Sequence, residues 1–162
     1  MSYWIRPAQA EDMEEIIALT DLAFGGKDEG RIVRKLAKDG DSVLSLVASD
    51  DHKILGHIQF FRILVDGEPA AVGLGPMSVH PGFQKTGIGS GLIQMSLMAL
   101  EGAGEGLVFV LGHPEFYPRF GFIPDMAEAF DSPWKGNPAF MALPLSECAP
   151  TSGELTYPPA FG

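Results

Sequence analysis

A glycine-rich segment between a strand-like run and a helix-like run carries the residues best suited to bind a ligand. It consists of Gln84, Lys85, Thr86, Gly87, Ile88, Gly89 and Ser90. A turn of this kind at a helix N-terminus exposes backbone N–H groups, and the helix dipole there favours negative charge. Gly87 and Gly89 allow a close approach, and the hydroxyls of Thr86 and Ser90 add donors. We therefore expect a phosphate group to bind at residues 84–90.

Two other glycine-rich phosphate motifs do not fit this segment. A Walker A loop has a Lys and then a Ser or Thr after its last glycine, whereas Ser90 follows Gly89 directly. A Rossmann fingerprint lies near the start of a βαβ unit, whereas this segment lies in mid-chain after runs that predict antiparallel strands. The pattern that remains is Q-x-x-G-x-G.

The strand predicted over residues 70–79, just before this segment, contains residues that disturb regular pairing. Gly73 and Gly75 weaken the strand, and Pro76 has no N–H group to donate. We expect this strand to bulge and to part from a neighbour, which leaves backbone groups unpaired beside the glycine-rich turn.

The Q-x-x-G-x-G pattern follows directly on Met77-Ser78-Val79, and this arrangement resembles the pyrophosphate-binding motif of the GNAT N-acetyltransferase superfamily. A second segment, Y-P-R-F-G-F over residues 117–122, resembles the Y-x-x-x-G-F segment that follows the next strand in that superfamily. The longer run V-L-G-H-P-E-F-Y-P-R-F-G-F is most similar to a bacterial subgroup of predicted acetyltransferases. The resemblance covers most of residues 3–145.

The resemblance implies a fold and a cosubstrate. The fold is an α/β (α+β) domain of GNAT type: a mixed, mostly antiparallel sheet flanked by helices, with a splayed strand that forms an acyl-CoA cleft. The cosubstrate is acetyl-CoA, with its diphosphate on residues 84–90. Its pantetheine arm mimics a strand beside Met77, Ser78 and Val79, where Met77 and Val79 supply main-chain contacts.

The resemblance also implies a mechanism in which Tyr117 is catalytic. An amine attacks a thioester only when neutral, and a free Lys amine has a pKa of about 10.4, so a proton must first leave. The thiolate that departs has a pKa of about 8.5 and benefits from a proton donor. By resemblance this donor is Tyr117, and the N–H of Met77 polarises the thioester oxygen. Candidate bases are Asp28, Glu29, His57 and a chain of water molecules.

These features predict an N-acetyltransferase that transfers an acetyl group to an amine by direct attack in a ternary complex. One alternative is a non-catalytic module that binds or senses acyl-CoA, because the phosphate cradle and the acceptor site are separable features. Another is a structural protein whose glycine-rich loop is only a turn. The sequence does not select among amine acceptors.

Composition and charge limit the domain count, the partners and the cellular location that fit this chain. The 162 residues, 46% hydrophobic, suit one domain over residues 1–162, with a core at about 3–145 and a C-terminal arm at about 146–162. A net charge of −10 without a basic cluster disfavours nucleic acid and anionic membranes as partners. The four histidines lack metal-site spacing, so we expect no metal. No leader or apolar run of about 18 residues is evident, which predicts a cytoplasmic protein.

Hydrophobic periodicity and turn residues predict the elements that position these groups. A helix is expected to open at Pro7 and to end at Gly25, and a second helix has Asp28 as its N-cap. The remaining predicted elements are a strand at 3–5, meander strands at 43–48, 54–64 and 70–79, a helix at 90–100, strands at 107–111 and 140–145, and a short helix at 115–120. The aromatic tail, with Trp134, Phe140, Tyr157 and Phe161, predicts an ordered arm. The exposed C-terminal strand and this tail favour a homodimer.

Overall fold

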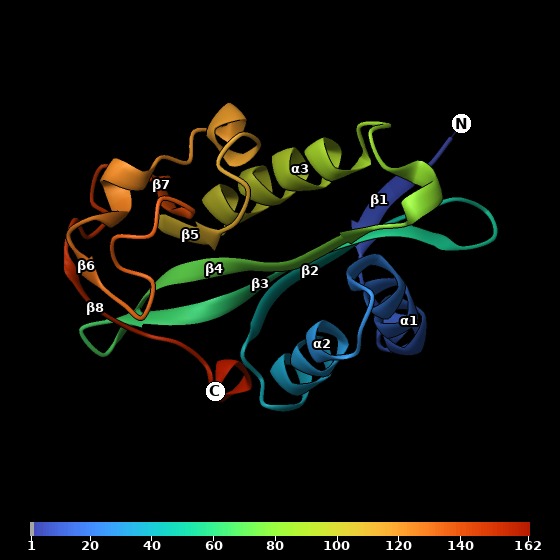
Figure 1. Cartoon of the computed structure of the whole chain (residues 1–162), viewed down its shortest axis with the longest axis horizontal. Helices are drawn as coiled ribbons and strands as arrows, with labels where there is room; N and C mark the ends of the chain where they lie inside the picture. The colour runs from blue at the N-terminus through green and yellow to red at the C-terminus, as the bar shows by residue number, and fades with distance from the viewer. Residues whose placement is uncertain (1) are drawn as a thin grey trace.

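An antiparallel meander forms the centre of the sheet in the computed structural model, which describes residues 2–162 (Figure 1). The strands in their spatial order are β1 (Trp4–Pro7), β2 (Ser42–Ser49), β3 (Ile54–Val65), β4 (Glu68–Val79), β5 (Leu107–Leu111) and β7 (Phe140–Pro144). Only β4 and β5 pair in parallel along this path; the other neighbours are antiparallel. The predicted mixed, mostly antiparallel sheet is confirmed.

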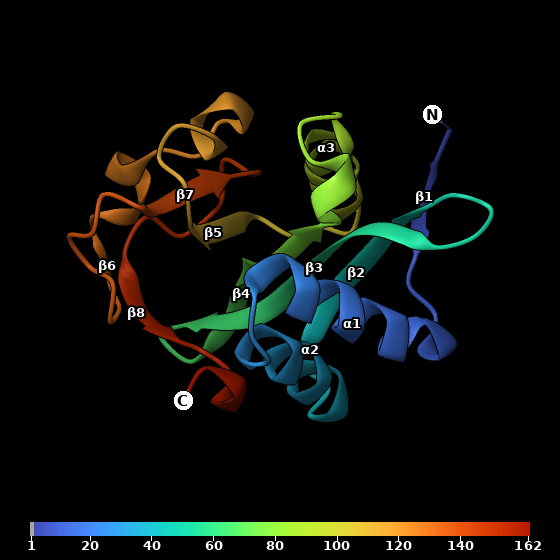
Figure 2. The same ribbon diagram turned by 45° about the vertical axis from the view of Figure 1, so that its right-hand side comes forward.

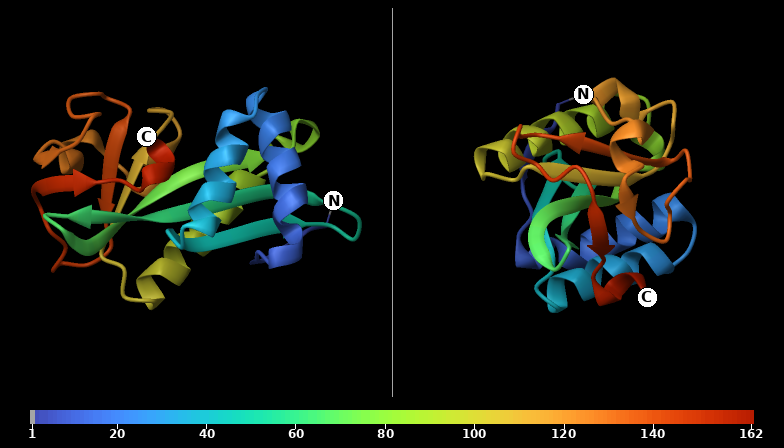
Figure 3. Two further views of the ribbon diagram at one scale, coloured as in Figure 1. Left: turned by 90° about the horizontal axis from the view of Figure 1, so that it is seen from below. Right: turned by 90° about the vertical axis from the view of Figure 1, so that its left-hand side faces the viewer.

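Helices cover both faces of the sheet. On one face lie α1 (Met13–Phe24) and α2 (Asp28–Lys38), and on the other lies α3 (Ile88–Gly102), as Figures 2 and 3 show from different sides. Leu92 and Ile93 of α3 are fully buried in the core cluster that contains Ile58 and Phe60 of β3. The burial of this face holds α3 against the sheet, whereas Met95 and Met98 of the same helix are exposed. Among residues 2–162, no helix is long and apolar enough to span a membrane.

A bulge interrupts β4 at the place where the sequence predicts one. The register of β3 and β4 shifts between Ile58 and Phe60. There β4 has one residue more than β3, because Gly75 and Pro76 lie opposite a single β3 residue. Beyond the bulge no strand of residues 2–162 pairs with β4 on its other side, since β5 pairs with residues 72–74. The splayed strand is therefore confirmed, and its open edge runs toward the glycine-rich loop.

The two N-terminal helices do not begin where the sequence suggests: α1 begins later than Pro7, and α2 begins one residue before the position that an N-cap at Asp28 implies. Pro7 ends β1, and a short 3-10 turn precedes α1, in which the Asp12 carboxylate accepts the Gln9 N–H at 2.7 Å and pairs with Arg6. The predicted N-cap at Asp28 is also wrong. Asp28 is the first residue of α2, and its carboxylate pairs with an arginine one turn later instead of capping the helix. In both cases a carboxylate bonds to a neighbouring arginine.

The C-terminal tail folds back along the sheet. Strand β8 (Gly153–Thr156) pairs with the end of β3 and with the short strand β6 (Phe130–Asp131), and a 3-10 turn at Pro159–Phe161 follows. This turn packs against α2. The helix expected at 115–120 is shorter than predicted, a 3-10 turn over Tyr117–Phe120. The tail is thereby brought next to the parted strands.

Candidate functional site

The glycine-rich segment forms a tight loop between β4 and α3, and two of its side chains hold it closed. The Gln84 side-chain amide donates to the Val79 carbonyl at 3.3 Å. The Thr86 hydroxyl donates to the Phe83 carbonyl. Thr86, which the sequence suggests as a hydroxyl donor to a ligand, is therefore already bonded within the loop. What the loop offers to a ligand is mainly its backbone.

That backbone presents a run of N–H groups to solvent. Among residues 2–162, no acceptor bonds to the N–H groups of residues 85–90. Lys85 and Gly87 have positive φ angles of 63° and 90°, which fold the loop so that successive N–H groups meet the first turn of α3. The Ile88 side chain is buried in the core, so only its main chain can contact a ligand. The loop has the donors and the dipole that suit a diphosphate.

The strand residues before the loop divide between the two faces of the sheet. Met77 and Val79 are partly exposed and pack toward the α3 side. Ser78 lies opposite His57 in the β3–β4 register, and its hydroxyl is buried without a partner among the described residues. The Ser78 side chain therefore lies on the opposite face of β4 from Met77 and Val79.

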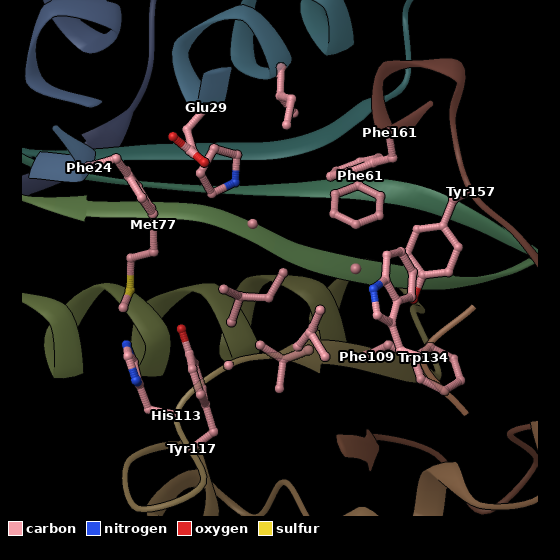
Figure 4. A pocket seen from close by; sticks show the side chains of 18 residues that line it. Phe24, Glu29, Phe61, Met77, Phe109, His113, Tyr117, Trp134, Tyr157 and Phe161 are labelled. Carbon is pink, nitrogen blue, oxygen red and sulfur yellow. The ribbon is translucent and has the colours of Figure 1, made fainter. Parts of the chain in front are cut away.

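A cavity of about 360 Å³ opens where β4 and β5 part (Figure 4). At one end lie Met77, His113 and Tyr117, and the Tyr117 hydroxyl points into the cavity. Glu29 enters from α2 on the other side of β4. The far end is lined by aromatic side chains: Phe61, Phe109, Trp134, Tyr157 and Phe161. The cavity thus joins a polar end to an apolar end.

Tyr117 is held rigidly at the polar end. Its side chain is buried, with the rings of Phe116 and Phe122 in edge-to-face contact at 5.2 and 5.8 Å. Gly112 lies so close to the ring that a Cβ at this position would overlap it. Burial raises the pKa of the Tyr117 phenol to about 12, which keeps it protonated at neutral pH. The site therefore presents a hydroxyl that can donate a hydrogen bond.

The structure separates the candidate bases. The His57 imidazole is buried on the α1–α2 side of β3, where its Nε2 atom is 2.8 Å from the Ser45 hydroxyl. Burial lowers its pKa to about 4. Neither His57 nor Asp28 lines the cavity, whereas Glu29 does. Of the three candidate side chains, Glu29 is therefore the one that lies at the cavity.

The sequence did not predict the apolar end of the cavity. Its rings come from β3, from β5, from the turn after β6 and from the C-terminal arm. Trp134, Tyr157 and Phe161 were expected to anchor the arm, and the tail does pack through them, but nothing in their spacing indicates that they line a cavity. His113 also lies at the polar end of the cavity.

Residues 4–124 match a family model described as an acetyltransferase (GNAT) domain. Two curated Escherichia coli K12 proteins are similar to the chain. One, named uncharacterized N-acetyltransferase YjhQ, is 36% identical over 138 residues, which cover 82% of this chain and 73% of the relative. The other, named uncharacterized N-acetyltransferase YhbS, is 34% identical over 113 residues, which cover 68% of each protein.

Two solved structures share the fold along almost the whole chain. A GNAT family acetyltransferase from Brucella melitensis in complex with acetyl-CoA has a TM-score of 0.85 and 35% identity, covering 99% of both chains. Escherichia coli YhbS in complex with CoA has a TM-score of 0.90 and 30% identity, covering 98% of this chain and 91% of its own.

Proposed function

Because the chain belongs to the GNAT family of acetyltransferases, we propose that it transfers the acetyl group of acetyl-CoA to an amine by direct attack within a ternary complex. It is an acyltransferase with acetyl-CoA as its cosubstrate. The observation that carries the proposal is the common opening beside β4. The free N–H groups of residues 85–90 follow the unpaired part of this strand, and the Tyr117 hydroxyl faces it.

In this proposal the loop binds the diphosphate of acetyl-CoA. The N–H groups of residues 85–90 donate to the phosphate oxygens, with Gln84 holding the loop in shape. The Lys85 ammonium group and the Ser90 hydroxyl add further donors. Main-chain groups of Met77 and Val79, on the open edge of β4, pair with the pantetheine arm as a neighbouring strand would. The contacts with the pantetheine arm need an unpaired strand edge, which β4 has beyond residues 72–74, where its pairing with β5 ends.

Tyr117 acts at the departing sulfur. When the amine nitrogen forms its bond to the thioester carbon, negative charge develops on the oxygen, and the Met77 N–H stabilises it. The C–S bond then breaks. Full proton transfer from a phenol of pKa about 12 to a thiolate of pKa about 8.5 is unfavourable. Tyr117 therefore first stabilises the sulfur through a hydrogen bond and passes on a proton as the nitrogen releases one. Counted from the neutral amine, the nitrogen loses one proton and the sulfur gains one, so the products are the amide and the CoA thiol. An amine that arrives as an ammonium group releases one further proton before it attacks.

Two measurements test this proposal: the binding of acetyl-CoA and the amine-dependent release of CoA. Titration calorimetry should show acetyl-CoA binding, and Gly89→Val should raise its Kd at least about tenfold, because two methyl groups would project from the first turn of α3 beside Met77 and Val79. Gly102→Val, at the other end of the same helix with open space around it, is the matched control. Release of CoA thiol must then depend on added amine, with the amide product detected by mass spectrometry.

The outcomes separate the alternatives. Acetyl-CoA binding without CoA release for any amine in a broad library would favour a sensing module. Equal acetyl-CoA Kd values for the wild type and Gly89→Val would show that the loop does not bind the cosubstrate.

A further inference from the structure

The apolar end of the cavity is a wall of aromatic rings from separate parts of the chain. The Phe61 and Phe161 ring centroids are 4.4 Å apart, and those of Trp134 and Tyr157 are 4.6 Å apart. Tyr157 also lies within 6.0 Å of the Phe161 ring, so the four rings form one cluster. We call Phe61, Trp134, Tyr157 and Phe161 the aromatic wall (Figure 4).

The fold fixes this wall in place. Gly73 on β4 leaves room for the Phe61 ring, which occupies the space that a side chain on residue 73 would need. Strand β8 pairs with β3 just before Tyr157, and the last turn of the chain packs on α2. The C-terminal arm is therefore part of the cavity, and the wall is a preformed apolar surface.

Glu29 brings a negative charge to the same cavity. Its carboxylate enters from the first turn of α2 and is half-buried. Over residues 2–162 it has no ion pair and no side-chain hydrogen bond, and no Lys or Arg lines the cavity. A half-buried carboxylate without a cation in its surroundings complements an ammonium group.

We propose that the acceptor is a primary amine with an aromatic or similarly bulky apolar body. The body lies against the aromatic wall, and Glu29 binds the ammonium group at the end that faces Tyr117. This inference rests on the proposed function, because the nitrogen must reach a thioester. A carboxylate in contact with the amine favours its charged form, so Glu29 improves binding of the acceptor and does not assist loss of the proton, which goes to water.

Two amines that share the same aminoethyl group test the wall. In 2-phenylethylamine this group carries a phenyl ring, and in ethanolamine it carries a hydroxyl. We expect kcat/KM to be at least about tenfold higher for 2-phenylethylamine, since burying a ring in an apolar pocket is favourable. Phe161→Ala should reduce this preference to about threefold or less. Trp4→Ala, a change at an exposed aromatic residue outside the cavity, should preserve the preference.

Removal of the Glu29 charge tests the ammonium site. Glu29→Gln should raise KM for 2-phenylethylamine at least about tenfold and change kcat much less. Inhibition by 2-phenylethanol, which has the ring but no amine, should change less than about threefold. Asp28→Asn removes the neighbouring charge on α2 that does not line the cavity, and it should behave like the wild type.

The results distinguish this inference from the proposed function. Equal kcat/KM values for the two amines, a preference for ethanolamine, or acetylation of spermidine alone would overturn the inference and leave N-acetyltransfer standing. Acetyl-CoA binding without turnover of either probe amine would also overturn it. Absence of acetyl-CoA binding would overturn the proposed function itself.

Discussion

The two ends of the opening beside β4 are built in different ways. The loop at residues 84–90 consists of neighbours in the sequence, and it offers backbone N–H groups. The aromatic wall consists of side chains that lie up to a hundred residues apart. A backbone site needs a particular turn and can be recognised from a short motif. A side-chain site depends on which segments the fold brings together, and its occupant can differ between proteins that share the motif.

Tyr117→Phe is expected to have the largest effect, and this effect should fall on turnover and not on cosubstrate binding. Loss of the hydroxyl should lower kcat about 100-fold or more, the usual span for a proton donor, with the acetyl-CoA Kd within about threefold of wild type. The phenyl ring keeps its contacts with Phe116 and Phe122, so the fold should be maintained. Steady-state kinetics and calorimetry measure the two quantities.

Tyr3→Phe is the control for that change, because Tyr3 does not line the cavity. Wild-type turnover in Tyr117→Phe would reduce Tyr117 to a packing residue. A large rise in the acetyl-CoA Kd would instead place its hydroxyl in cosubstrate binding.

His57 should affect stability without affecting turnover, because it lies on the other side of the sheet. Its pKa is about 4 in the folded protein and about 6.5 when unfolded, so the unfolded chain binds more protons between these values. Its contribution is complete above pH 6.5 and is lost as pH falls toward 4. By pH 4.5 the free energy of unfolding should fall by about 2 to 3 kcal/mol from this group.

Urea denaturation at pH 7 and pH 4.5 measures this effect. The fall with pH should be smaller in His57→Gln by about 2 kcal/mol, and kcat at pH 7.5 should stay within about twofold of wild type. His52→Gln, at an exposed histidine, should retain the full fall. An unchanged pH dependence in His57→Gln would show that the fall comes from other groups.

Gly112→Ala should displace the Tyr117 hydroxyl without removing it. The added methyl group overlaps the tyrosine ring, which neighbouring rings hold, so the hydroxyl must shift. We expect kcat to fall about 10- to 30-fold, because small displacements of a reacting group are costly. Gly106→Ala, just before β5, meets only ordinary contacts and is the control. A kcat equal to that of Gly106→Ala would mean that the position of Tyr117 is not critical.

Much of the fold could be predicted from the sequence because its signals are local. The strand predicted at 107–111 matches β5, and the predicted meander strands lie within β2, β3 and β4. The bulge was predictable because Gly75 and Pro76 each disturb pairing by their own chemistry. The first residues of the helices were harder to predict. The Asp28 carboxylate can bond either to the backbone or to an arginine, and it bonds to Arg31.

The aromatic wall could not be predicted, since no local signal distinguishes a ring in a core from a ring in a cavity. Phe61 alternates with its neighbours as any strand residue does. Tyr157 and Phe161 meet it only because β8 returns to pair with the end of β3. Glu29 is one of several candidate bases in the sequence, and only the fold shows that it lines the cavity whereas the His57 side chain faces away from it.

Lys85→Gln should give the smallest effect, and it tests whether the loop binds through its backbone. The Lys85 side chain is exposed, and an exposed charge near a phosphate contributes little in solution with salt. We expect the acetyl-CoA Kd to rise about two- to threefold at low ionic strength and to match wild type at about 0.5 M salt, where the Debye length is only a few ångströms. Lys38→Gln, at an exposed lysine on α2, should leave the Kd unchanged at both salt concentrations. A loss of tenfold or more that persists at high salt would make the Lys85 side chain a principal phosphate ligand, and the loop would then depend on a side chain as the acceptor end does.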